Sequence, residues 1–427
     1  MSLTFTTSFF RLRLTLHSFH MTTHQRMFRA LFAVAIILGI AMGTRNAFSG
    51  LFLQPISADM KWGREVFSLA IALQNLVWGA SQPFIGYIAD RYGAKRVLMV
   101  GAVLYTVGLT WTAFLSNTFT LALSGGILMG VAIACTTYSV AYSVLGKMVP
   151  PERRAWAFGI SAAAGSFGQF LLIPVGQWFI SHHGWSFSLI GLALITATIA
   201  PLGWYFAKLG DEGKLPQPVS NVRQATAGEA LRTAFADRSF SLLTLGYFVC
   251  GFQVVFIGAH LTPYLLDKGI EARVGVTALA LIGLFNCFGT YLAGVVAGKM
   301  PKRYVLSFIY LMRSVVIVAF LAMPISEWSV YAFAAAIGFL WLSTVPPTNA
   351  IIAQVYGVRY LGMLGGIVFF SHQIGSFLGA WLGGKIYDAT GNYNTVWMLT
   401  IALGVFAALV HLPIDERALE GRQPAMA

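Results

Sequence analysis

The sequence predicts an all-α membrane protein of twelve transmembrane helices, arranged as two pseudo-symmetric six-helix bundles. Three observations support this fold class: the composition, the spacing of apolar segments and an internal repeat. Of the 427 residues, 57% are hydrophobic and 10% are charged, whereas a soluble domain carries roughly 25% charged residues. The mean hydropathy of +0.72 is too high for one soluble core, so we expect lipid to solvate much of the surface.

A spanning helix needs about 20 mostly apolar residues, and the chain holds twelve such segments. A polar stretch at 208–238 separates the first six from the last six, and with Pro216 and Pro218 it is expected to be a solvated cytoplasmic linker. The predicted spans are 28–53, 66–89, 96–116, 118–146, 154–181 and 185–207, followed by 239–266, 274–298, 303–324, 328–354, 359–386 and 393–413.

The spans define a first bundle at 28–207 and a second at 239–413, with a cytoplasmic tail at 414–427. Arg11 and Arg13 could belong to a signal or transit peptide, but no adequate apolar core with a cleavage site follows them. Residues 1–27 are instead expected to form a disordered cytoplasmic N-terminus. We expect Met21 to be the working start, although the sequence leaves Met1 open.

The basic residues predict the orientation. If the amino terminus is cytoplasmic, the inside segments hold 21 of the 28 Lys and Arg residues, and the outside loops hold only Lys61, Arg64, Lys268 and Arg273. Cytoplasmic loops carry such an excess, so both termini are expected on the cytoplasmic side of the cell (inner) membrane. The net charge of +13 is spread over short loops without a basic run, which argues against a nucleic-acid partner.

An internal repeat indicates two equivalent halves. Gly159, Ile160, Gly168, Gly176 and Gly184 recur 207 residues later as Gly366, Ile367, Gly375, Gly383 and Gly391. Small residues at helical spacing let helices approach closely. Repeated halves with the substrate bound between them near the midplane are a common transporter architecture.

A loop motif stands between the second and third predicted spans. Its residues are Gly86, Asp90, Arg91, Gly93, Lys95 and Arg96. Gly93 permits a tight turn, and Asp90 at a helix end can pair with cations and a neighbouring helix terminus, as a latch between moving halves. The motif resembles the cytoplasmic loop motif of the major facilitator superfamily. This resemblance covers nearly the whole chain and implies two six-helix bundles and alternating access.

The corresponding loop of the second half holds a degenerate copy of the motif. It keeps Gly294, Gly298, Lys299, Lys302 and Arg303 but lacks the aspartate. A charge latch in this loop should therefore be weaker.

Segments 158–168, 183–187 and 384–393 are similar to monocarboxylate transporters and to the related oxalate:formate antiporters. The resemblance implies a small carboxylate as substrate. Two of that family's features are absent: an acidic, aromatic-rich motif entering the first helix, and an Asp–Arg pair in the eighth, whose positions hold Asn286 and Thr290. Proton coupling through that pair is therefore not implied.

Charged residues inside the spans point to an anionic substrate. None of the 15 carboxylates lies deep in a predicted span, which disfavours a carboxylate relay, a sodium site and cationic substrates. Arg45 lies in the middle of the first span, where an arginine costs roughly 2.5–3.5 kcal/mol on insertion scales. A guanidinium can bind a substrate carboxylate through two parallel hydrogen bonds. We expect Arg45 to anchor the substrate, with bonding to carbonyls at a helix break as the alternative.

Three further residues are candidates because they carry or can accept a positive charge within a span. Arg313 is a second possible ligand, unless it packs between helices or snorkels. Histidine titrates near neutrality, so His260 or His372 could bind a proton together with an anion. The alternative for both histidines is a purely structural hydrogen bond.

Polar side chains that share helix faces complete the candidate site. Lipid offers them no partners, so such faces must meet other helices or water. The residues assigned to substrate binding on this ground are Gln74, Tyr138, Tyr142, Asn286, Trp341 and Gln373. Interhelical hydrogen bonding without substrate contact is the alternative for each.

These observations predict a secondary active transporter of a small, monocarboxylate-like organic anion, with protons coupled through substrate protonation or His260. Uniport and anion exchange stay open, as do direction and oligomeric state. An efflux pump for apolar drugs or metabolites is the first alternative, given the 14% aromatic content. A non-transporting membrane sensor, which we would expect to carry an appended domain, is the second. No nucleotide loop, catalytic constellation or metal-ligand spacing is visible, so we expect no enzyme activity, cofactor or metal.

Overall fold

The computed structural model describes residues 22–62, 64–213 and 226–419, and all regular elements in these ranges are helices. Ten helical stretches among them are long and apolar enough to cross a membrane. One of these, Pro151–Glu212, has 62 residues and contains two spans, because Gly184 with a φ of +83° turns the chain. With α3 (Arg64–Tyr92), which has 29 residues, the total reaches the predicted twelve.

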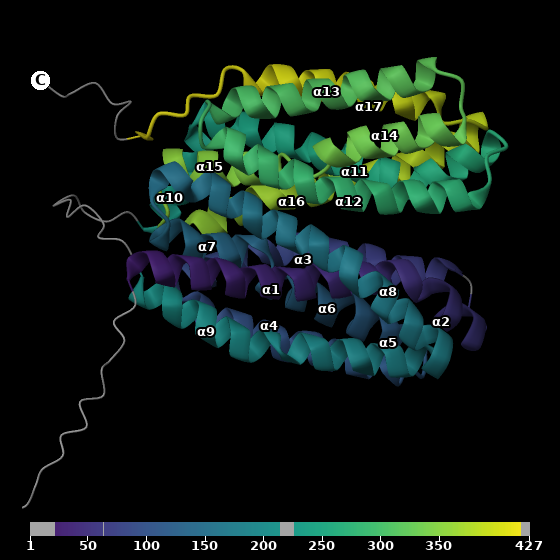
Figure 1. Ribbon diagram of the computed structural model, residues 1–427, viewed down its shortest axis with the longest axis horizontal. Helices are drawn as coiled ribbons and strands as arrows, with labels where there is room; N and C mark the ends of the chain where they lie inside the picture. The colour runs from purple at the N-terminus through teal and green to yellow at the C-terminus, as the bar shows by residue number, and fades with distance from the viewer. Residues whose placement is uncertain (1–21, 63, 214–225, 420–427) are drawn as a thin grey trace, which may run out of the picture.

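The first half is built from ten helical elements, and Figure 1 shows how they are arranged. The first three spans are α1 (Thr23–Leu51), α3 and α4 (Ala94–Ala113), with the short α2 (Leu53–Asp59) after α1. The fourth span combines α5 (Thr118–Leu121), the π-helix η1 (Ala122–Leu128), α6 (Met129–Thr136) and α7 (Tyr138–Met148). The fifth and sixth are α8 (Pro151–Ala197) and α9 (Ile199–Glu212), with the turn at Gly184 inside α8.

The second half repeats this plan. Its first three spans are α11 (Arg238–Asp267), α12 (Ala272–Ala297) and α13 (Lys302–Ala322). The next span combines α14 (Glu327–Leu340) and α15 (Val345–Val355), and the last two are α16 (Leu361–Thr390) and α17 (Asn394–His411).

The predicted linker contains a helix that the sequence analysis did not anticipate. α10 (Ala227–Ala236) begins at a capping box formed by Thr226 and Glu229, a motif that fixes a helix start. At ten residues it is far too short to register as a span. At the N-terminal end of the first bundle, α1 begins at Thr23, five residues before the predicted start at residue 28. Of the residues 1–27 predicted to be disordered, 1–21 lie outside the described ranges, and α1 already includes residues 23–27.

Two spans are interrupted at corresponding positions of the two halves. Thr137 separates α6 from α7 with extended backbone angles, φ −110° and ψ −165°. Residues 341–344 separate α14 from α15, and Thr344 follows Thr137 by 207 residues, the offset of the internal repeat. Broken backbone at membrane depth is tolerated only where protein or a water-filled cavity satisfies it.

The repeated glycines hold equivalent helix pairs together. A Cβ atom on Gly168 of α8 would lie 2.0 Å from the carbonyl oxygen of Gly39 in α1. A Cβ atom on Gly375 of α16 would lie 2.0 Å from the carbonyl oxygen of Phe248 in α11. Only glycine allows these close backbone contacts, which explains the same spacing in both halves.

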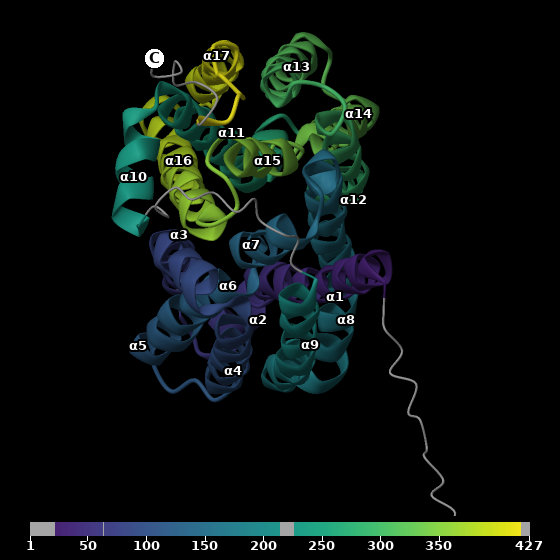
Figure 2. The same cartoon turned by 90° about the vertical axis from the view of Figure 1, so that its left-hand side faces the viewer.

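The two halves lie one above the other in Figure 1, with α1 beginning and α17 ending at the left. We call this end the terminal face and the other end the opposite face. Figure 2 looks onto the terminal face and shows α3 and α7 beside α16, and α8 beside α12. The halves meet through these contacts and through a further contact of α8 with α15.

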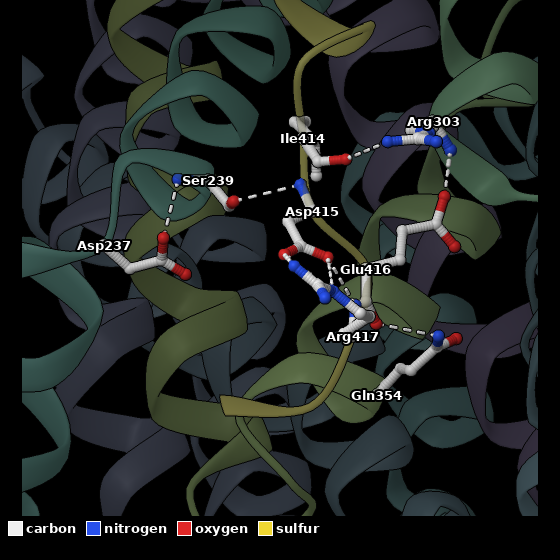
Figure 3. A network of polar contacts seen from close by, with 8 residues as sticks. All are labelled: Asp237, Ser239, Arg303, Gln354, Ile414, Asp415, Glu416 and Arg417. Atoms are coloured by element: carbon white, nitrogen blue, oxygen red, sulfur yellow. Dashed lines mark hydrogen bonds and ion pairs between the residues drawn. The ribbon is translucent and has the colours of Figure 1, made fainter. Parts of the chain in front are cut away.

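The chain after α17 folds back onto the terminal face of the second half (Figure 3). Glu416 accepts a 2.6 Å hydrogen bond from the backbone N–H of Arg303 and lies 3.7 Å from the Lys302 ammonium. The Arg303 guanidinium donates to the carbonyl of Ile414 at 2.9 Å, and Gln354 donates to the carbonyl of Glu416 at 2.8 Å. The tail thereby brings a carboxylate to the degenerate loop motif, which has none of its own.

Candidate functional site

A cavity of about 210 Å³ lies between the two halves. Both halves contribute to its wall, including the segments beside both helix breaks. The lining residues are Met42, Arg45, Asn46, Asn75, Trp78, Tyr138 and Gln169 from the first half, and Tyr247, Val254, Val255, Leu279, Ile282, Gly283, Asn286, Trp341, Leu342, Val345, Phe369, His372, Gln373 and Ser376 from the second. This described wall contains five aromatic residues and five side-chain amides but no aspartate or glutamate.

Arg45 is the charged residue of this wall, and neutral groups hold it. Its NH1 and NH2 groups donate to the side-chain oxygens of Asn46 at 3.0 Å and Asn75 at 2.7 Å. Both amides are oriented by their own donation to helix carbonyls, of Met42 at 2.7 Å and Ile71 at 3.1 Å. Its guanidinium carbon lies 5.3 Å from the centre of the Trp78 ring. These contacts fix the position of the side chain and leave its charge uncompensated.

The Nε–H group of Arg45 is a buried donor. Its Nε is shielded from solvent and has no hydrogen-bond partner among the described residues. A buried donor without a partner costs about 1–3 kcal/mol. A carboxylate bound in the cavity could satisfy this donor and balance the charge at once.

His372 and Gln373 line the opposite wall, on α16. Gln373 donates from Nε2 to the backbone carbonyl of Asn75 at 3.1 Å, a bond that crosses from the second half to the first. Its Oε1 lies 3.1 Å from Nδ1 of His372. The residue that positions Arg45 is therefore also bonded to the α16 pair.

Asn286 connects the halves on the other side of the cavity. Its Nδ2 donates to Ser166 of α8 at 2.9 Å, and its Oδ1 accepts from the backbone N–H of Leu342 at 3.0 Å. The second bond satisfies backbone exposed by the break between α14 and α15. Asn286 therefore places Leu342 and the adjacent Trp341 in the cavity wall.

Arg313 stabilises the same break from behind and does not line the cavity. Its side chain is 1% exposed and donates to the carbonyls of Leu340, at 3.1 and 2.7 Å, and of Trp341. A further bond of 3.3 Å reaches the Gln253 side chain. Carbonyls freed by a helix break need such donors inside a membrane.

The structure places six of the ten predicted binding residues in the cavity wall: Arg45, Tyr138, Asn286, Trp341, His372 and Gln373. Besides Arg313, three residues lie elsewhere. Gln74 donates to the carbonyl of Gly125 at 2.7 Å, and Tyr142 to that of Phe158 at 3.1 Å. His260 lies 2.9 Å from the carbonyl oxygen of Ala380 and 3.3 Å from the Tyr393 hydroxyl. These contacts match the structural alternative for each residue.

Sequence reasoning missed several wall residues, above all Asn75. Gln74 shares a helix face with Trp78 and was therefore predicted, but Asn75 is the residue that bonds Arg45. A polar residue three positions before Trp78 was the available signal, since positions i and i+3 also share a helix face. Phe369 and Tyr247 carry no comparable signal, because aromatic residues are common in every span.

The loop motif joins the two halves on the terminal face. Asp90 accepts a 2.9 Å hydrogen bond from the backbone N–H of Met363, at the start of α16, and lies 3.9 Å from the Lys147 ammonium. A helix N-terminus favours a carboxylate. A Cβ atom on Gly86 would lie 2.1 Å from the carbonyl oxygen of Gly362, so this glycine permits the contact.

The remaining motif residues lie around this contact. Gly93 adopts a φ of +89° between α3 and α4, a conformation that glycine adopts without strain. Arg91 donates to the hydroxyl of Tyr87 at 2.6 Å, and Lys95 lies 5.6 Å from the Trp204 ring centre. Arg96 is exposed.

A motif of this kind on a twelve-span, two-half fold agrees with the sequence comparison. The sequence model described as "Major Facilitator Superfamily" matches residues 34–380. The chain belongs to the major facilitator superfamily. The superfamily consists of membrane transporters, so this chain is a multi-pass membrane transport protein.

Curated members of the superfamily match most of the chain. The MFS-type transporter YcxA of Bacillus subtilis (strain 168) is 25% identical over 401 residues, which cover 92% of this chain and 96% of YcxA. Monocarboxylate transporter 11 of Homo sapiens is 26% identical, covering 86% of this chain and 76% of its own length. The oxalate:formate antiporter of Oxalobacter formigenes is 23% identical, covering 88% of both chains.

Solved structures of the superfamily share the fold. The proton:xylose symporter XylE superposes with a TM-score of 0.69 at 15% identity, covering 93% of this chain and 98% of XylE. The fucose:proton symporter of E. coli gives a TM-score of 0.64 at 16% identity, covering 90% and 97%. At this identity the likeness concerns the fold alone.

Proposed function

We propose that this protein is a secondary active transporter that carries a small, monocarboxylate-like organic anion by alternating access. The observation that carries the proposal is Arg45, an intramembrane cation in a cavity whose described wall offers no carboxylate. Holding such a charge costs roughly 2.5–3.5 kcal/mol, and an anionic substrate would offset that cost. Two relatives of the chain, a monocarboxylate transporter and an oxalate:formate antiporter, agree with a carboxylate substrate.

The cavity size also favours a small substrate. Its volume is about 210 Å³. Ligand pockets for drug-sized molecules are larger, at about 300–1,000 Å³. A carboxylate with a short carbon skeleton fits this space.

The proposed topology places the terminal face in the cytoplasm of a cell (inner) membrane. This assignment rests on the excess of Lys and Arg in the segments on that side. The contacts of Asp90 and Gly86 with α16 would then close the cavity toward the cytoplasm, and separating α3 from α16 would open it.

The decisive experiment is uptake of labelled acetate, lactate, pyruvate and benzoate into proteoliposomes. We expect saturable uptake by the wild type of at least one of the four. Arg45→Gln should raise KM by about ten- to a hundredfold, because a hydrogen bond to a charged group contributes about 1.5–3 kcal/mol.

Lys385→Gln is the matched control, since Lys385 also lies in a span but contacts Trp381, with its ammonium 4.7 Å from the ring centre, outside the cavity wall. Its kinetics should equal those of the wild type. Uptake of none of the four carboxylates, or an unchanged KM in Arg45→Gln, would refute the proposal.

An efflux pump for apolar drugs or metabolites is the second candidate. The aromatic wall residues Trp78, Tyr138, Tyr247, Trp341 and Phe369 favour it, because such side chains bind apolar molecules. It leaves Arg45 and the five amides of the wall without a role. Transport of uncharged aromatic compounds with equal rates in wild type and Arg45→Gln would select this alternative.

A further inference from the structure

We propose that His372 is the proton-binding site that couples proton movement to anion transport, and that it is tied to Arg45 by a chain of hydrogen bonds across the cavity. The inference rests on the proposed anion transport. It assigns proton coupling to one residue of α16 and not to His260.

His372 is held firmly in the cavity wall. The side chain is 7% exposed. Its ring is stacked on Phe369, with ring centres 5.5 Å apart, and lies 5.1 Å from the ring of Tyr247. These contacts fix the plane of the imidazole and restrict rotation of the ring.

The hydrogen bonds assign the tautomer of His372. Gln373 must turn its Nε2 toward the carbonyl of Asn75, because a carbonyl only accepts. Its Oε1 therefore faces Nδ1 of His372 at 3.1 Å, and Nδ1 must donate. The neutral ring then carries its proton on Nδ1, and Nε2 is the nitrogen that can accept a second one.

A continuous chain connects this imidazole to Arg45. Arg45 donates to the side chain of Asn75 at 2.7 Å, Gln373 donates to the backbone carbonyl of Asn75 at 3.1 Å, and His372 donates to Gln373. The chain starts in α1 and α3 of the first half and ends in α16 of the second. Any motion that separates α3 from α16 therefore changes the surroundings of His372 together with access to the cavity.

The groups near His372 include two cations, and the described cavity wall contains no carboxylate. Tyr247 and Cys250 face it from α11, Tyr138 lies in the wall from α7, and α3 and α15 present only uncharged side chains there. The nearby cations are Arg45, in the same wall, and Arg313, whose NH2 lies 3.6 Å from the Cys250 sulfur. A like charge opposes protonation and an opposite charge favours it.

The substrate supplies the negative charge that the wall lacks. When a carboxylate binds at Arg45, His372 Nε2 accepts a proton from water on the open side of the cavity. After the cavity opens on the other side, the carboxylate leaves and Nε2 releases the proton to water there. Because each ligand raises the affinity for the other by the same factor, anion and proton cross together.

Proteoliposomes that carry the four labelled monocarboxylates test this mechanism. The two readouts are anion exchange at equal pH on both sides, and uptake driven by an inward proton gradient with an internal pH dye. We expect the wild type to show both, with one proton entering per anion. The apparent anion affinity should fall by up to about tenfold per pH unit above the histidine transition.

The variants separate coupling from binding. His372→Gln should lose gradient-driven uptake and dye response, since a neutral amide cannot take up a proton, and any exchange that remains should no longer depend on pH. His260→Gln should retain both activities, because His260 bonds to Ala380 and Tyr393 away from the wall. Gln373→Glu gives His372 a carboxylate partner and should extend high anion affinity to higher pH, even if His372→Gln folds poorly.

Each of the following outcomes would overturn the inference. Gradient-driven uptake that survives in His372→Gln would assign coupling to protonation of the substrate itself. Loss of coupling in His260→Gln, or an unshifted pH profile in Gln373→Glu, would contradict the role of the α16 pair. Failure of the wild type to exchange any of the four anions would refute the proposed function as well, whereas exchange without pH dependence would refute only the coupling.

Discussion

Arg45 and Arg313 show how the same residue type takes different roles inside one membrane protein. Both are mid-span arginines in the sequence. Arg45 lies in a cavity wall between two amides and keeps an N–H group without a partner in the described chain. Arg313 donates to two carbonyls at a helix break and is 1% exposed. The contacts of Arg45 suit a residue that binds a ligand, and those of Arg313 suit a residue that stabilises the helix break.

Replacing Arg313 by methionine should therefore destabilise the protein without changing how it binds substrate. The carbonyls of Leu340 and Trp341 would be left buried without a donor, at about 1–3 kcal/mol each. We expect a clear drop in the thermal unfolding midpoint in detergent. The KM of the folded fraction should stay within about twofold of the wild type, and a KM increase as large as that of Arg45→Gln would instead make Arg313 a ligand.

The candidate site was predictable to the extent that residue type is informative. An arginine in a span is costly enough to be noticed, and Arg45 is in the wall. Gln74 and Asn75 are adjacent polar residues, and only packing decides that Gln74 bonds the carbonyl of Gly125 while Asn75 bonds Arg45. A rotation of α3 by one residue, about 100°, would exchange their roles, and the sequence does not fix that rotation.

At the scale of the helices, we expect the stability of the contact between α3 and α16 to depend on pH. Asp90 lies just beyond the predicted span 66–89, and burial raises its pKa from 3.8 to about 7, against the opposing effects of Lys147 and of the N–H groups of Met363 and Gly362. Asp90 therefore binds a proton more readily when α3 and α16 are in contact than when they are separated and its carboxyl group is exposed. Closure is most favoured below about pH 4, weakens as the pH rises to about 7, and is constant above it.

Asp90→Asn should remove this pH dependence. Asparagine does not ionise, yet its side-chain oxygen can still accept from the Met363 N–H. Amide hydrogen exchange at the start of α16, corrected for its intrinsic pH dependence, measures the opening. Protection in the wild type should fall by up to about tenfold per pH unit between 4 and 7 and stay level in Asp90→Asn. Asp267→Asn on the opposite face is the control, and an equal loss there would contradict the assignment to Asp90.

The tail after α17 should stabilise the second half through Glu416. Its carboxylate accepts from the backbone N–H of Arg303, as an N-cap residue would at the start of α13, and N-cap substitutions cost about 0.5–2 kcal/mol. Glu416→Ala should lower the thermal midpoint accordingly. Glu271→Gln is the contrast, because Glu271 pairs with Arg273 at 2.6 Å on the exposed surface, where ion pairs contribute little. Equal effects of the two changes would refute the capping role.

The molecule as a whole is less symmetric than its sequence repeat. Gly86 and Asp90 of the first half bridge to α16 of the second. In the second half, Gly298 occupies the position 208 residues after Asp90. In this region α12 contacts α8 through Gly294 and Gly159. A Cβ atom on Gly159 would lie 2.8 Å from the Cα atom of Gly294. Lys302 and Arg303 of the degenerate motif contact Ile414 and Glu416 of the tail instead. On the terminal face, the contact of α3 with α16 therefore carries charge, whereas the contact of α8 with α12 at Gly159 and Gly294 is a close backbone approach.

The number of spans, their approximate boundaries and the loop motif follow from the sequence alone, because lipid requires long apolar segments and each half must repeat them. The breaks at Thr137 and before Thr344 do not follow, since neither Gly nor Pro marks the first, and their carbonyls are satisfied by residues distant in the chain such as Arg313. The chain from Arg45 through Asn75 and Gln373 to His372 joins three helices of two halves. Local periodicity specifies which residues a helix contains, whereas the rotation of each helix against its neighbours decides which of them face the cavity.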